Sequence, residues 1–371
     1  MKLKNLFILI LSLFLLSACS ADKEIKEVAE LEKDQNDKKV EKTVEEEPEE
    51  KFYSPISGLE VEEDISREPI FAIMYDNHPY AIPQSAITDA EVIYEFKVEG
   101  QYTRFLALFL KNKPEAIGSV RSARPYFANT AKEYDSIYIH WGGSEAGYAT
   151  ISSDNLMDID GIAYEGSTFY RNKETKKRRP HDGYTSYDLL YKRAEEKGYL
   201  ENINNEPFFK FDISEDLEDL TSQMGDKIAD SVSLDFFAKY NMTADYDKSG
   251  DNYSFTRNGQ KVTDEKNNEE LRAKNVIIEF ASSKITGPKD TLTIDHIGSG
   301  TGKLLSRGKI IDITWEKPDA TSKTTFKTLS GDEIILNPGL TFVEVIDSED
   351  LIHILPEEST PESEEATNEK V

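Results

Sequence analysis

Three histidines in the first half of the chain could supply imidazole groups for acid–base chemistry or for metal binding. They are His78, His140 and His181, and Asp76 lies two residues before the first of them. Three imidazoles and a carboxylate are sufficient ligands for a divalent metal ion. No two of these histidines are close enough in sequence to share one helix face, so only the fold could bring them together. Histidines that are hydrogen-bonded at strand ends are the alternative that we favour, so we expect no metal and no cofactor.

Arginines are the second set of candidate residues. Arg104, Arg121 and Arg124 lie in apolar sequence, and a basic run covers residues 171–179. Residues 101–200 carry 15 basic and 13 acidic side chains, a net charge of +2, although the whole chain carries −27. The planar guanidinium group suits carboxylate and phosphate, so this local excess favours an anion-binding face. Neutralisation of neighbouring acids is the alternative, and for the run 171–179 we favour it and expect a solvated loop.

These residues lead us to predict a polar cleft that takes an anionic wall component or a partner protein. The alternative is a hydrolase or transferase acting on the cell wall, in which carboxylates and histidines serve as acid and base. A carboxylate pair such as Glu95 and Glu99 could serve a glycosidase. The absence of a standard nucleophile motif favours a non-catalytic protein. The candidate cleft residues are Asp76, Asn77, His78, Glu95, Arg104, Arg121, Arg124, His140, Ser144, Arg171 and His181.

Two glycine-rich segments match catalytic or phosphate-binding loops only in part. The sequence His-Trp-Gly-Gly-Ser at 140–144 is similar to the oxyanion segments of lipases, but no Gly-x-Ser-x-Gly elbow follows it. A P-loop at 298–303 would need glycine at position 297, which is Ile, and Ser or Thr at position 304, which is Leu. We therefore interpret 298–303 as a turn that connects two strands.

The N-terminus predicts export and lipid attachment. Lys2 and Lys4 precede an apolar run over 6–16, which is too short to span a membrane, and Leu-Ser-Ala-Cys follows and ends at Cys19. This ending resembles the lipobox of bacterial lipoproteins, in which residues 1–18 would be the signal peptide. An ordinary signal peptide with a chance cysteine is the alternative. Two acyl chains of the palmitate type on Cys19 would anchor the protein stably at the outer, extracytoplasmic face of the cell membrane.

Acidic segments flank the central part of the chain. Residues 20–51 hold 13 acidic and 7 basic side chains with no aromatic residue, and 356–371 holds six glutamates and one lysine. Such segments cannot bury enough apolar surface to fold. We therefore predict a lipidated, disordered tether over 19–51 and a disordered tail over 356–371. The net charge of −27 excludes a nucleic-acid partner, and one cysteine excludes a disulfide scaffold.

The central part is long enough for two domains. Hydrophobic patterning predicts a mixed α/β (α+β) fold, with a domain over 52–215 that mixes helices and strands and a smaller β-rich domain over 216–355. The seam falls in the polar stretch 205–230. We expect helices over 125–134 and 184–199, and strands over 70–75, 91–98, 102–110, 136–141, 275–281, 291–294, 309–315, 333–336 and 341–346.

Ordered sequence blocks in both halves resemble the YerB-like lipoproteins. The first half carries them over 71–79, 83–85, 99–100, 103–107, 117–125, 140–144, 169–171, 179–181 and at Tyr184; the second half carries them over 298–300, 308–309, 314–315 and 337–339. The sequence departs from the family pattern at Glu145-Ala146 and at Asp182-Gly183, which affects the lining of any pocket there. The resemblance implies a membrane lipoprotein of mostly Gram-positive bacteria, with a layered α/β N-terminal domain and no established activity.

Overall fold

The computed structural model describes residues 51–287 and 291–355. The predicted signal peptide, Cys19, the tether up to residue 50 and the tail 356–371 lie outside the described residues. Within the described ranges, no helix has the length and hydropathy needed to cross a membrane.

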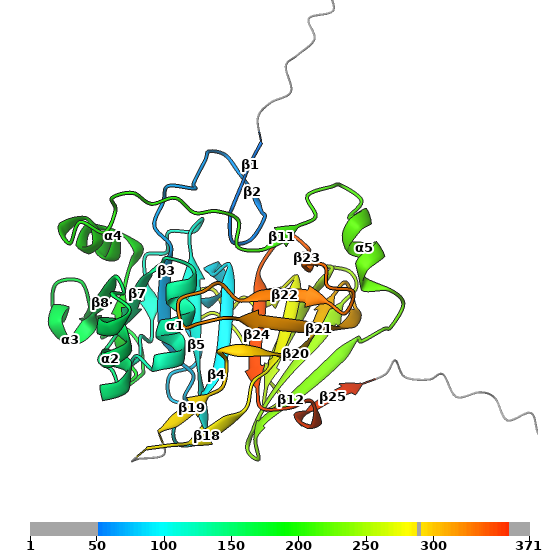
Figure 1. Cartoon of the computed structure of the whole chain (residues 1–371). Helices are drawn as coiled ribbons and strands as arrows, with labels where there is room; N and C mark the ends of the chain where they lie inside the picture. Colours follow the sequence, from blue (N-terminus) through cyan, green and yellow to red (C-terminus); the bar gives the residue numbers. More distant parts are fainter. Residues whose placement is uncertain (1–50, 288–290, 356–371) are drawn as a thin grey trace, which may run out of the picture. The chain divides into compact units, whose positions relative to one another are not determined.

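A ten-stranded mixed sheet runs through both halves of the chain, in the order β22-β21-β20-β17-β24-β4-β5-β3-β7-β8 (Figure 1). The first half contributes β3 (Phe71–Asp76), β4 (Val92–Val98), β5 (Tyr102–Phe109), β7 (Ile137–His140) and β8 (Asp158–Asp160). The second half contributes β17 (Asn275–Phe280), β20 (Gly298–Ser306), β21 (Lys309–Lys317), β22 (Thr325–Thr328) and β24 (Thr341–Ile346). The halves join where β24 pairs in parallel with β4.

The central strands of this sheet, from β17 to β7, are largely buried on both faces, which explains their apolar runs. Strands β21 and β22, at one edge, keep several exposed or half-buried residues. Along β3, Phe71, Ile73 and Tyr75 enter one core, whereas Ala72 and Met74 enter the other. Helix α1 (Pro125–Glu133) and helix α2 (Glu145–Ser153) contribute buried side chains to the second core, and helix α4 (Tyr187–Glu196) contributes to the first. The sheet is therefore the middle layer of the fold.

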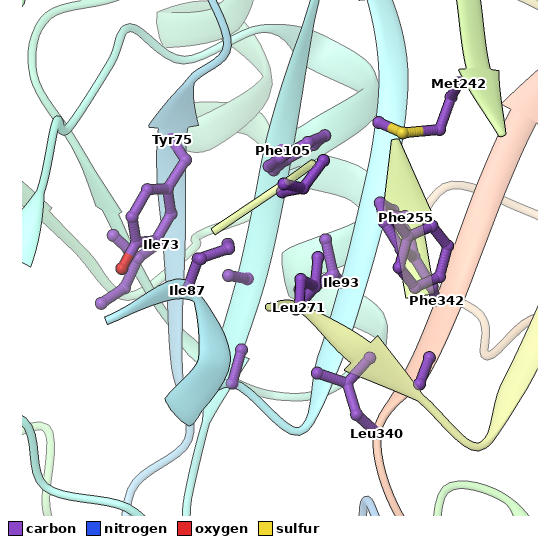
Figure 2. Packing of buried hydrophobic residues seen from close by; sticks show 14 of the residues in the cluster. Ile73, Tyr75, Ile87, Ile93, Phe105, Met242, Phe255, Leu271, Leu340 and Phe342 are labelled. Carbon is purple, nitrogen blue, oxygen red and sulfur yellow. The ribbon is translucent and has the colours of Figure 1, made fainter. Parts of the chain in front are cut away.

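A second sheet covers the first core. Its strands are β12 (Ser231–Phe237), β13 (Tyr240–Asp247), β14 (Asn252–Arg257), β15 (Gln260–Lys261), β16 (Arg272–Ala273) and β25 (Ile352–Leu355). Strict alternation along β12 buries Val232, Leu234 and Phe236. Figure 2 shows side chains from this sheet packing against the large one, and the rings of Phe255 and Phe342 lie 4.7 Å apart.

Short elements complete the described part. A three-stranded sheet in the order β6-β10-β9 is important for the site described below. It consists of β6 (Ile117–Gly118), β10 (Gly183–Thr185) and β9 (Tyr170–Arg171). The others are β1 (Phe52–Tyr53), β2 (Glu60–Val61), β11 (Lys210–Phe211), β18 (Ser283–Ile285), β19 (Leu292–Ile294), β23 (Ile335–Leu336), α3 (Gly161–Tyr164), α5 (Glu218–Met224), η1 (Ile87–Asp89) and η3 (Glu349–Leu351).

The structure confirms the mixed α+β class but corrects two predictions. The segment 298–303 belongs to β20 and is not a turn. Its glycines are required by close packing: a Cβ atom on Gly300 would lie 2.7 Å from the ring of Trp315, and one on Gly302 would collide with the backbone oxygen of Ile278. The helix predicted over 184–199 is shorter, because residues 183–185 form β10 and the helix begins at Tyr187.

Candidate functional site

Asp76, the last residue of β3, is the centre of a polar cluster. Its Oδ2 atom lies 2.6 Å from Nδ1 of His181 and 2.9 Å from Nε of Arg121. Its Oδ1 atom accepts a hydrogen bond of 3.1 Å from the backbone N–H of His78. The carboxylate is buried, so these contacts take the place of water around its charge. We call Asp76, His78, Arg121 and His181 the Asp76 cluster.

Backbone pairing at the end of β3 holds this cluster together. The N–H of Asp76 donates to the oxygen of Ser119, and the N–H of Arg121 donates to the oxygen of Met74, both at 2.9 Å. His181 precedes β10, which pairs with β6. Segments more than 40 residues apart in sequence therefore meet at one point, which sequence spacing alone could not reveal.

Several polar atoms of the Asp76 cluster are available to a ligand. Nη1 and Nη2 of Arg121 and Nε2 of His181 have no hydrogen-bond partner among the described residues. Nδ1 of His78 accepts from the backbone N–H of Tyr80 at 3.1 Å, so a neutral His78 carries its proton on Nε2. The two imidazole rings stack at 4.7 Å. Burial, followed by the positive charge of His181, lowers the pKa of His78.

Two further arginines lie near this cluster and make its surroundings electropositive. Arg124 forms a forked ion pair with Glu99, with nitrogen–oxygen distances of 2.8–3.0 Å. Arg104 lies opposite Asp76 on β5 and donates to the backbone oxygen of Ser122 at 2.8 Å. Within the described ranges, Arg104 has no carboxylate partner. Burial and the charges of Arg124 and Arg121 lower the pKa of Arg104 to about 10.

A pocket of about 900 Å³ opens beside His181. One wall is the loop 174–179, which we call the basic loop; it is largely exposed, as predicted for a solvated loop. We call the cavity the basic pocket. It is lined by Tyr80, Ile82, Pro83, Glu174, Thr175, Lys176, Lys177, Arg178, Arg179, His181 and Glu265. His181 belongs to both the Asp76 cluster and this pocket, so it links the two.

Other predicted site residues lie in separate contacts. Nε2 of His140 lies 3.2 Å from Asp158 and its Nδ1 lies 2.8 Å from the oxygen of Gly142, so both ring nitrogens are used. Ser144 caps helix α2 by accepting from the N–H of Gly147 at 3.0 Å. His140 and Ser144 are therefore held by local contacts that have a structural role.

Arg171 also has complete local partners. Its guanidinium group pairs with Asp182 at 2.9 Å and with Glu165 at 3.1 Å, and it lies 3.9 Å from the ring centre of Trp141. These partners all come from the same half of the chain as Arg171. Arg171 therefore supports the fold beside the basic loop and does not line the basic pocket.

Glu95 and Asn77 belong to a buried network on the other side of β3. Oε1 of Glu95 accepts from the hydroxyl of Tyr240 at 2.6 Å and from Nδ2 of Asn77 at 3.1 Å, and it also accepts from Thr103. Burial raises the pKa of Glu95. Tyr240 comes from the second sheet, so this network connects the two halves of the chain and is closed to solvent.

The described residues contain no group of three or more His, Cys, Asp or Glu side chains arranged to hold a metal ion. His78 and His181 are adjacent, but His140 lies in a different cluster. Sequence reasoning did not identify Tyr80 and Glu265, which line the basic pocket, or Tyr102, whose ring lies 4.5 Å from that of His78. Tyr80 lies two residues after His78 in the sequence, which was a weak indication that it belongs to the site. Glu265 comes from the second half of the chain, and nothing in the sequence indicated that it lies here.

Comparison with known proteins is consistent with this architecture, in which a layered α/β part is followed by a β-rich part. A family model described as "Protein of unknown function (DUF3048) N-terminal domain" matches residues 56–200, and the model of the DUF3048 C-terminal domain matches residues 232–343. The chain therefore belongs to the DUF3048 family.

A curated relative carries the name "Putative lipoprotein YerB" and comes from Bacillus subtilis (strain 168). It is 31% identical over 297 residues, which is 80% of this chain and 86% of the relative. A crystal structure of YerB protein from Bacillus subtilis is similar in fold, with a TM-score of 0.73 and 29% identity over 82% of this chain and 99% of that one. The predicted resemblance to the YerB-like proteins is thus confirmed.

Proposed function

We propose that this protein is a lipid-anchored component of the cell envelope that binds an anionic ligand beside Asp76. The lipid is on Cys19, the tether 19–51 separates the folded part from the membrane, and the folded part faces outward. The sequence before Cys19 and the name of the Bacillus subtilis relative support this placement. The ligand is an anionic wall component or an acidic group of another envelope protein.

One observation carries the binding proposal: within the described residues, the unpartnered Nη1 and Nη2 donors of Arg121 and the unpartnered Nε2 atom of His181 stand beside Asp76, and His181 also lines the basic pocket. Arg104, Arg121 and Arg124 supply three positive charges, and Asp76 and Glu99 supply two negative ones. The local excess of positive charge is balanced when an anion binds. Charge-assisted hydrogen bonds to guanidinium groups contribute about 1.5–3 kcal/mol each where water is excluded.

The test is calorimetric titration of the mature chain with inorganic phosphate and with a short peptide that has a free carboxylate. Arg121→Ala is expected to weaken binding about 10- to 100-fold, since that corresponds to one charge-assisted pair. Its free energy of unfolding should change little, because Asp76 keeps His181 and the N–H of His78. Arg272→Ala, which removes an exposed arginine of β16, is the matched control. Severe unfolding of Arg121→Ala without any anion binding by the parent would make Arg121 a structural residue and refute the proposal.

A second function is favoured by one feature, the orientation of His181. Asp76 holds Nδ1 of His181, which lines the basic pocket, as in acid–base dyads in which a carboxylate orients an imidazole and leaves Nε2 to exchange a proton. A hydrolase or transferase acting on wall material would use Nε2 to move a proton. Asp76→Asn should then abolish turnover of wall fragments while phosphate binding persists. No release of fragments by the parent protein at any pH near neutrality would exclude this function.

A further inference from the structure

Tyr80 presents an exposed aromatic face at the rim of the basic pocket. The residue is 74% exposed. Its backbone N–H donates to Nδ1 of His78, and its ring lies 5.0 Å from the ring of His78 and 6.1 Å from that of His181. The ring therefore stands beside both histidines of the Asp76 cluster and leaves most of its surface open to a ligand.

The basic pocket has two chemically different walls. Tyr80, Ile82 and Pro83 form an apolar wall, and the basic loop forms a charged wall. Lys176 and Arg178 have no charged partner among the residues that the structure describes, whereas Lys177 pairs with Glu265 at 2.9 Å. A ligand therefore meets an apolar surface on one side and unpaired cations on the other.

Acceptor groups are present as well. Glu174 and Glu265 line the pocket beside the four cations Lys176, Lys177, Arg178 and Arg179, which leaves a net charge of +2. The net positive charge attracts an anion, but a ligand with anionic groups alone offers the two carboxylates no hydrogen-bond donor. A ligand with hydroxyl groups can donate hydrogen bonds to them and still place its anionic group on the cations.

We propose that the basic pocket binds an acidic saccharide, whose ring packs its C–H face on Tyr80 and whose carboxylate or phosphate pairs with Lys176 and Arg178. This inference rests on the proposed anion-binding function and specifies its ligand class. A sugar ring has an apolar face, several hydroxyl donors and, when acidic, one anionic substituent. The apolar residues around Tyr80, the two carboxylates and the unpaired cations of the pocket match these three features in turn.

The experiment titrates the mature chain with N-acetylmuramic acid, glucose 6-phosphate, neutral N-acetylglucosamine and inorganic phosphate. One of the two acidic sugars is expected to bind at least tenfold more tightly than the neutral sugar and than phosphate. Which of the two binds distinguishes a carboxylate source from a phosphate source. Tyr80→Ala should weaken that sugar about tenfold and leave phosphate unchanged, whereas Tyr80→Phe should bind like the parent. Leu329→Ala, another exposed apolar residue, is the control.

The outcomes separate the two proposals. If phosphate binds and the sugar ring adds no affinity, or if Tyr80→Ala has no effect on the sugar, the saccharide inference is wrong and anion binding stands. If neither phosphate nor any acidic sugar binds, both proposals fail. Two other results would also overturn the saccharide inference. One is tighter binding of adenosine monophosphate than of either acidic sugar, and the other is retention on vesicles of phosphatidylglycerol through the basic loop.

Discussion

Glu95 on β4 and Glu344 on β24 occupy directly paired positions in neighbouring parallel strands, and both carboxyl groups are fully buried. Oε2 of Glu95 and both oxygens of Glu344 have no hydrogen-bond partner within the described part of the chain. Burial raises the pKa of both groups, and the charge of Glu95 raises the pKa of Glu344 further, well above its usual value. Burial and the neighbouring charge of Glu95 therefore both favour the protonated form of Glu344.

Glu344→Gln should reduce the pH dependence of stability. The pKa of Glu344 is raised in the folded state, so its contribution is complete below the unfolded value of 4.5 and is lost as pH rises toward the folded pKa. Glutamine does not titrate in this pH range, and its side-chain amide can donate a hydrogen bond to the carboxylate of Glu95. Urea unfolding from about pH 5 to about pH 9 should show a flatter curve for the variant. Glu269→Gln, at an exposed position, should keep the slope of the parent.

Glu279 on β17 gives an independent pH prediction. Burial, followed by the charge of Glu133, raises its pKa to about 8. The folded protein therefore loses stability as pH rises from 4.5 toward about 8, by an amount on the order of a few kcal/mol. The free energy of unfolding of Glu279→Gln minus that of the parent should therefore increase as pH rises over this range. A difference that stays constant with pH would contradict the buried, protonated state of Glu279.

Gly302→Ala should destabilise the large sheet. An added Cβ would collide with the backbone oxygen of Ile278, and neighbouring strands cannot move apart without losing hydrogen bonds. We expect a loss of about 1–3 kcal/mol, measured as a lower urea midpoint. Thr301→Ala, at an exposed position of the same strand, is the control. Equal midpoints for the two variants would show that β20 has room for a side chain there.

Cys19→Ala should abolish lipid attachment. Cys19 is the one cysteine of the chain, so labelled palmitate has no other cysteine to modify. The variant should keep its signal peptide, run more slowly on a gel and incorporate no label. Thr43→Ala, in the tether, should be processed and labelled like the parent. A Cys19→Ala protein that is cleaved and labelled normally would exclude lipidation at this residue.

The strands of the first half could be predicted because their patterns are strong. The apolar run that begins at Ile70 and the alternation before Trp141 correspond to β3 and β7. The segment 298–303 was mistaken for a turn because its glycines indicate turns locally. They serve instead to admit Trp315 and a neighbouring strand, and that close packing depends on residues distant in sequence. Strands β12 to β14 were also missed.

The candidate site was predictable in its residue types and only partly in its grouping. Asp76, His78, Arg121 and His181 do meet, with Arg104 and Arg124 nearby. Whether this group binds a ligand stays a prediction. His140 and Arg171 carry the same chemical groups but are satisfied by local carboxylates. Sequence composition cannot distinguish a paired arginine from an unpaired one, because pairing depends on backbone register at the ends of β3 and β6.

The position of β24 has a consequence for biogenesis. This strand comes from near the end of the chain, yet it lies between β17 and β4 and joins the two halves of the large sheet. A chain exported N-terminus first, as proposed above, cannot complete this sheet until residues 341–346 have crossed the membrane. During transit the open edge of β4 would pair readily with other chains, so it needs protection.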